Sequence, residues 1–250
     1  MKKTFSIMCT FIVISVCLYA TPTLAWHDAT HMAVVRAAGL ENLAYLAVGA
    51  DMAKEKAAGE SANHYCNMPK GVEVTPEMVL AQVGDYNENG DADGHLYGAI
   101  IAAIDDYLLR SSGGKYGLYP LGYAAHYIGD LSMPLHNVAY DAFNKANHSA
   151  NDGIVERTGP PGETTDAKVA RLAEEIRKRM AKLPPIWINN DVRQFHRDLA
   201  TRIAAIANRA AALGYTLQET QRTRMTEEEA YMQLAQSAQL LQAVYAAVTP

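Results

Sequence analysis

Cysteine is scarce in this sequence, which contains three cysteines in 250 residues. Cys9 and Cys17 lie in an apolar N-terminal stretch that we expect to be removed, so only Cys66 would stay in the processed chain. A single cysteine excludes an internal disulfide. Such a chain must gain its stability from a packed core or from bound metal, because metal binding adds directly to the folding free energy.

The first 25 residues have the three parts of a secretory signal peptide. Two lysines form a basic start, an apolar stretch runs from Phe5 to Tyr19, and small residues precede Trp26. No later segment is apolar enough to span a bilayer. We therefore expect a leader at residues 1–25 and a secreted or periplasmic product that begins at Trp26.

The remaining 225 residues lack a Gly/Ser-rich or Pro-rich linker, an internal repeat and the alternation typical of strands. We therefore predict one all-α domain over residues 26–250, a helical bundle. One apolar stripe shows the helical spacing and comprises Phe195, Leu199, Ile203, Ile206, Ala210 and Leu213. Gly214 follows this stripe and is a candidate C-cap, and Thr226 with Glu229 forms a predicted capping box for a last helix.

Basic residues do not exceed acidic ones. Beyond the leader 20 basic and 27 acidic residues remain, a formal net charge of −7 with neutral histidines. This balance excludes a global electrostatic attraction for nucleic acid or for an anionic membrane.

Histidine and aspartate are arranged in pairs. In the segment HYIGDLSMPLH, His126 and Asp130 are four residues apart and would leave the same face of a helix. His148 and Asp152 repeat this spacing. The proline in the segment is expected to end or kink the helix, so that His136 can approach the site from a different direction. Zinc prefers neutral imidazole and carboxylate oxygen, so these pairs predict a metal site. His31 and His64 are further candidate ligands, and His27, His95 and His196 show no partner pattern.

The chain resembles the zinc-dependent phospholipase C family, which includes single-strand-specific nucleases of the same fold. The resemblance covers residues 26 to about 152 and rests on Trp26, the segments SANHYCN and HYIGDLSMPLH, and the pair His148 and Asp152. In that family the N-terminal tryptophan chelates zinc through its amino nitrogen and carbonyl oxygen. Cleavage before Trp26 would therefore complete a metal site as well as release the chain.

The resemblance implies three zinc ions. The first would be bound by Asp51, His64, His126 and Asp130; the second by His136, His148 and Asp152; the third by Trp26 and His31, with Asp130 bridging. It also implies hydrolysis of a phosphodiester, in which paired cations neutralise the phosphate and acidify a water. Asp51 would either orient or deprotonate that water, or act only as a ligand.

Three functions fit this pattern. The favoured one is a phospholipase C that cleaves phospholipid headgroups during transient membrane-surface contact, although Ala29, Met52 and Ser61 stand where the family's choline-binding residues would be. The second is a single-strand nuclease or 3'-nucleotidase with nucleic acid as its substrate, which needs an aromatic stacking site. The third is a non-catalytic zinc-binding protein, which a cleft at the metals would argue against.

The acidic run from Asp85 to Asp93 resembles the first positions of a calcium loop. Leu96 replaces the bidentate glutamate that such a loop requires. We therefore expect a solvated acidic turn here, with Ca²⁺ binding at Asp85–Asp93 as the less favoured alternative.

Overall fold

The chain folds as an all-α domain in a computed structural model that describes residues 26–54, 57 and 59–249. The expected leader, residues 1–25, lies outside the described residues. No strand occurs among the described residues, which confirms the predicted fold class. None of the described helices is long and apolar enough to cross a bilayer.

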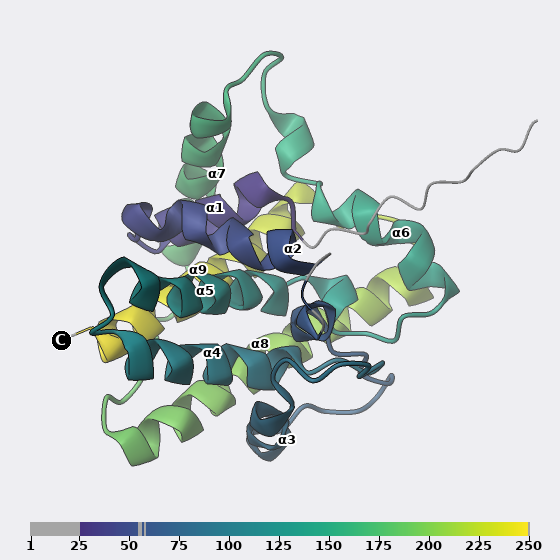
Figure 1. The fold of residues 1–250 in the computed structure, drawn as a ribbon. Coiled ribbons are helices and arrows are strands. Elements are labelled where there is room, and N and C mark those ends of the chain that lie inside the picture. The colour runs from purple at the N-terminus through teal and green to yellow at the C-terminus, as the bar shows by residue number, and fades with distance from the viewer. Residues whose placement is uncertain (1–25, 55–56, 58, 250) are drawn as a thin grey trace, which may run out of the picture.

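The longer helices make up the frame of the domain (Figure 1). They are α1 (Asp28–Ala37), α4 (Leu96–Arg110), α5 (Tyr119–Leu131), α6 (Ala142–Asp152), α7 (Thr165–Met180), α8 (Val192–Glu219) and α9 (Glu227–Val248). Shorter helices join them: α2 (Gly49–Lys54), α3 (Pro76–Ala81) and the 3₁₀ helices η1 (Glu41–Val48), η2 (Glu60–His64), η3 (Gln82–Asp85), η4 (Gly114–Leu118), η5 (Pro134–His136) and η6 (Glu156–Thr158).

Helix α5 lies in the middle of the domain. Figure 1 shows it between α1 and α4, and it also packs on η1 and α9. Its sequence explains this position, because leucine, isoleucine and alanine occur on all sides of it and leave no polar face for solvent. Gly122 permits the close approach of η1, since a Cβ there would lie 2.6 Å from the Cβ of Leu46. Polar residues on the C-terminal half of α5 are therefore buried.

One predicted helix end is confirmed and another is wrong. Thr226 caps α9 and forms the predicted capping box with Glu229. The prediction that Gly214 ends its helix is wrong, because α8 continues to Glu219. Gly214 is instead a point of close packing, where a Cβ would lie 2.8 Å from Cγ1 of Val138 and 2.9 Å from the carbonyl oxygen of Pro134. The glycine thus lets α8 approach the loop that carries His136.

Candidate metal centre

Helix α5 supplies the centre of the site with His126 and Asp130, both 0% exposed. They lie one turn apart on the same face, as predicted, with His126 Nε2 3.3 Å from Asp130 Oδ2. The other ring nitrogen of His126, Nδ1, donates a hydrogen bond to the carbonyl oxygen of Ala47 at 2.6 Å. A carbonyl can only accept, so this contact keeps the proton on Nδ1 and leaves Nε2 free to bind a metal.

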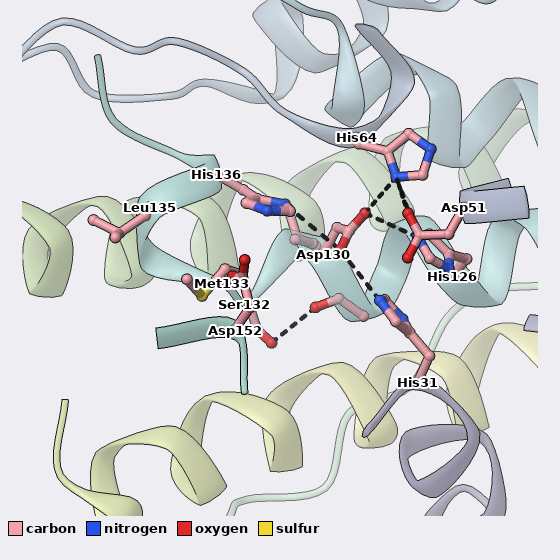
Figure 2. A network of polar contacts seen from close by, with 12 residues as sticks. His31, Asp51, His64, His126, Asp130, Ser132, Met133, Leu135, His136 and Asp152 are labelled. Carbon is pink, nitrogen blue, oxygen red and sulfur yellow. Dashed lines mark hydrogen bonds and ion pairs between the residues drawn. The ribbon is translucent and has the colours of Figure 1, made fainter. Parts of the chain in front are cut away.

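Asp130 brings four histidines together (Figure 2). Its Oδ2 lies 2.9 Å from His64 Nδ1 and 3.3 Å from His126 Nε2, and its Oδ1 lies 3.4 Å from His31 Nε2 and 3.5 Å from His136 Nδ1. Burial by itself would raise the pKa of Asp130. The nearby His126 and His136 outweigh burial and hold the pKa well below its usual value. Asp130 is thus suited to bridge two cations.

A second group forms where η5 meets α6. His148 and Asp152 come from successive turns of α6, with His148 Nε2 3.6 Å from Asp152 Oδ2, and His136 comes from η5. Asn144 orients His148, because its Oδ1 accepts from His148 Nδ1 at 2.8 Å while its Nδ2 donates to the carbonyl oxygen of Leu135. This leaves His148 Nε2 directed at His136.

The remaining side chains come from the N-terminal third of the domain. His31 of α1 stacks on His126, with ring centroids 3.7 Å apart, and needs Gly129 beneath it because a Cβ there would lie 2.6 Å from His31 Nδ1. Asp51 of α2 lies 3.6 Å from His126 and 3.7 Å from His64 of η2. Segments that are far apart in the sequence therefore converge on α5.

Several of these buried polar atoms have no hydrogen-bond partner. They are Oδ2 of Asp51, both carboxylate oxygens of Asp152, Oδ1 of Asp130, both ring nitrogens of His31, and Nδ1 of His136. An unsatisfied buried polar group costs about 1–3 kcal/mol, so this concentration of them in one place requires compensation. Imidazole nitrogens and carboxylate oxygens are also the donors that divalent transition metals prefer. The donor set fits bound metal.

Three buried groups in the described part of the chain could each hold a metal ion. They are His31, His126 and Asp130; Asp51, His64 and His126; and His136, His148 and Asp152. These groups contain all the predicted His and Asp ligands. The identity of the metal stays a prediction.

Trp26 is the predicted ligand that acts through its backbone. Its side chain is 0% exposed, and its indole Nε1 lacks a hydrogen-bond partner. The segment after it docks on Glu156 of η6: Thr30 donates from both its backbone N–H and its hydroxyl to Oε1 of Glu156, each at 2.9 Å. The predicted cleavage before Trp26 falls at the edge of the undescribed residues, so the role of its amino group stays a prediction.

The site opens onto a cavity of about 260 Å³. Its lining includes the ligand candidates His64, His136 and His148 together with Lys54, Ser61, Tyr65, Asn67, Ala92, Leu135 and Tyr140. Tyr140 is 45% exposed and meets His148 edge to face, with ring centroids 6.3 Å apart. The metal candidates are therefore reachable from solvent through a pocket with tyrosine side chains.

Lys54 is a site residue that the sequence reasoning missed. Its Nζ lies 2.8 Å from Asp51 Oδ1, and its side chain is 16% exposed. Burial raises the pKa of Asp51, but the charges of His126 and Lys54 outweigh burial and lower the pKa to about 2. The i, i+3 spacing from Asp51 on a helix is the signal that could have identified it.

The acidic turn at Asp85–Asp93 is committed to other contacts. Asp91 pairs with Nδ1 of the buried His95 at 2.8 Å and accepts from the backbone N–H of Asp93. In residues 26–54, 57 and 59–249, the His, Cys, Asp and Glu groups that converge closely enough for a metal lie elsewhere. Calcium binding at this turn stays a prediction without structural support.

No family model, no characterised protein and no solved structure matches this chain. The geometry of the site therefore carries the functional argument.

Proposed function

We propose that this chain is an exported, metal-dependent phosphodiester hydrolase. The observation that carries the proposal is the convergence on Asp130, beside a cavity, of three groups that could each hold a metal ion. A structural metal site is closed by protein ligands, whereas a catalytic site keeps access for water and substrate. The proposal includes zinc as the metal. It also includes the kind of activity found in zinc-dependent phospholipase C enzymes and their nuclease relatives, which the chain resembles.

Asp51 and Lys54 would have different roles in such a reaction. When bound, divalent cations would neutralise the phosphate oxygens and acidify a water molecule. Asp51 would hold that water by accepting its hydrogen bond, since the low pKa of Asp51 keeps the side chain a carboxylate. Lys54, which forms an ion pair with Asp51, would instead pair with a phosphate oxygen and so add a positive charge at the substrate.

The lining of the cavity favours a nucleic-acid substrate over a phospholipid headgroup. Tyr65 and Tyr140 line the cavity and offer aromatic faces for stacking a base, and Asn67 adds an amide. Two positions of the expected choline-binding residues are occupied by the buried Ala29 and by Met52, which is 74% exposed. Neither side chain has a carboxylate or an aromatic ring that could bind choline. We therefore infer a single-stranded nucleic acid or nucleotide as the first substrate to test, with phospholipid as the alternative.

The experiment uses the processed protein beginning at Trp26. It is incubated with single-stranded DNA, a 3'-nucleotide, phosphatidylcholine and phosphatidylethanolamine, before and after treatment with a chelator and after addition of Zn²⁺. We expect turnover that the chelator abolishes and zinc restores, and a Tyr140→Ala variant should lose activity on the nucleic acid selectively. Absence of chelator-sensitive turnover on all four substrates would refute the enzyme and leave the non-catalytic metal-binding protein.

A further inference from the structure

A buried glutamate outside the predicted ligand set contacts His64. Glu60 is 4% exposed, and its Oε1 lies 3.2 Å from Nε2 of His64, four residues later in η2. The other ring nitrogen, Nδ1, lies 2.9 Å from Asp130 and 3.7 Å from Asp51. Figure 2 shows this nitrogen turned toward both aspartates and the other nitrogen turned away from them. His64 therefore stands between the metal candidates and Glu60.

Glu60 is itself held on both oxygens. Tyr127, a 0% exposed residue of α5, donates its hydroxyl to Oε1 at 2.7 Å, and the amide of Asn63 donates to Oε2 at 3.3 Å. A carboxylate can only accept, so Glu60 calls for a proton on Nε2, whereas Asp130, 2.9 Å from Nδ1, calls for one on Nδ1. When a cation lies between Nδ1 and Asp130, only Glu60 still needs a proton from His64, and the proton stays on Nε2. That proton leaves the lone pair on Nδ1, which faces the metal candidates.

A second layer of contacts fixes Asn63. Its Oδ1 lies 2.9 Å from Nε2 of His95, whose Nδ1 lies 2.8 Å from Asp91 of the acidic turn. Its amide also donates to Oδ1 of Asn87, which lies in the same turn, at 2.8 Å. Because His95 is 0% exposed, this connection runs through the interior of the protein. The acidic turn is thus connected through Asn63 to Glu60 and the metal candidates.

We propose that Glu60 is a positioning residue for the metal centre: it fixes the tautomer and ring orientation of His64, and Asn63 and His95 anchor it to the acidic turn. Outer carboxylates of this kind orient metal-binding histidines and raise their basicity, and their loss typically weakens metal binding by about 10–100-fold. The inference rests on the metal centre of the proposed function and does not depend on the substrate.

The test compares Glu60→Gln and Glu60→Ala with the unaltered protein, each in processed form. Affinity is measured by competition with a chelator, and the absorption spectrum of the Co²⁺-loaded protein reports the ligand geometry. We expect Glu60→Gln to bind one ion about 10-fold more weakly and Glu60→Ala about 100-fold more weakly, in the range typical of outer-shell losses, each with an altered Co²⁺ spectrum. The glutamine loses less because its amide oxygen can still accept from His64.

Glu163→Gln is the matched control. Glu163 is a half-buried glutamate, and in the described part of the chain its carboxylate accepts hydrogen bonds from Arg171 and from none of the metal candidates. Unchanged affinity and an unchanged spectrum in Glu60→Gln would overturn the inference, as would an equal loss in Glu163→Gln. An unaltered protein that binds no metal would overturn both proposals. One that binds metal but hydrolyses nothing would overturn the proposed function alone, since the Co²⁺ spectra still decide the role of Glu60.

Discussion

The Nε2 atoms of His136 and His148 face each other at 3.1 Å inside the protein. His148 has committed its Nδ1 proton to Asn144, so its Nε2 carries a lone pair. A neutral His136 can donate its Nε2 proton to this lone pair, or it can hold its proton on Nδ1 so that both Nε2 atoms face a cation. Burial and the charge of Lys54 lower the pKa of His148 to about 4, and burial holds the pKa of His136 well below its ordinary value. Both rings are therefore neutral at neutral pH, the form in which imidazole binds a metal.

The metal-free protein should lose stability on acidification. Unfolded His148 takes up a proton near pH 6.5, whereas the folded side chain resists protonation down to about pH 4, so lower pH favours the unfolded state. The full shift corresponds to about 3 kcal/mol of unfolding free energy across this window. His136 and His31, with lowered pKa values, act in the same direction, and His126, with a raised pKa, acts against them. Urea unfolding of chelator-treated protein across the window measures the loss.

His148→Gln tests the assignment of this effect. A glutamine has no proton to gain in the window, so the stability of this variant should fall less steeply with pH than that of the unaltered protein. Equal slopes for the two proteins would show that another group causes the acid sensitivity.

Asp152→Asn should change metal binding and metal-free stability in opposite directions. Burial, together with the negative charge of Asp130, raises the pKa of Asp152 well above its usual value, so the charged carboxylate is unfavourable without metal. The amide should raise the unfolding free energy of the metal-free protein by about 1 kcal/mol, the scale of one relieved buried group. It should also weaken one metal site at least 10-fold, because a charged ligand is lost.

Asp141→Asn on the same helix is the control for this variant. Asp141 caps α6 by accepting from the backbone N–H of Asn144, and asparagine serves equally well as a cap. It should leave metal affinity and stability nearly unchanged. If the metal-free Asp152→Asn protein is less stable than the unaltered one, the prediction that the buried carboxylate destabilises the metal-free protein is contradicted.

A processed chain that keeps one extra residue before Trp26 should bind one metal ion fewer. The added peptide bond removes the free amino group that the family resemblance assigns as a ligand. Metal content by elemental analysis should fall by one ion, and most of the hydrolytic activity should be lost. A chain starting at Trp26, purified in parallel, is the control; equal metal content and activity in the two would refute N-terminal chelation.

Lys54→Met should reduce kcat/KM on a phosphodiester by about 10–100-fold, the scale of one charge-assisted hydrogen bond to a charged group. Lys54→Arg should retain more activity because the positive charge stays beside Asp51. Lys70→Met removes an exposed lysine paired with Glu219 and serves as the control. A Lys54→Met enzyme as active as Lys70→Met would exclude a role for Lys54 in binding phosphate.

Local pattern was enough to predict the all-α class, two C-terminal helices and the two His and Asp pairs. Spacing of four residues places His126 with Asp130 and His148 with Asp152 on single helix faces, whatever the rest of the chain does. The capping box at Thr226 is local in the same way. The one helix end assigned wrongly, at Gly214, failed because a glycine that caps a helix and a glycine that allows close packing look alike in sequence.

By itself, then, the sequence determined an all-α chain with two His and Asp pairs that could chelate a metal. Only the tertiary structure decided that α1, α2, η2, η5 and α6 meet at α5, that a cavity opens there, and that Lys54 and Glu60 join the site. The physical reason is that convergence depends on how apolar faces pack between segments far apart in the chain, and helical periodicity carries no information about which faces meet.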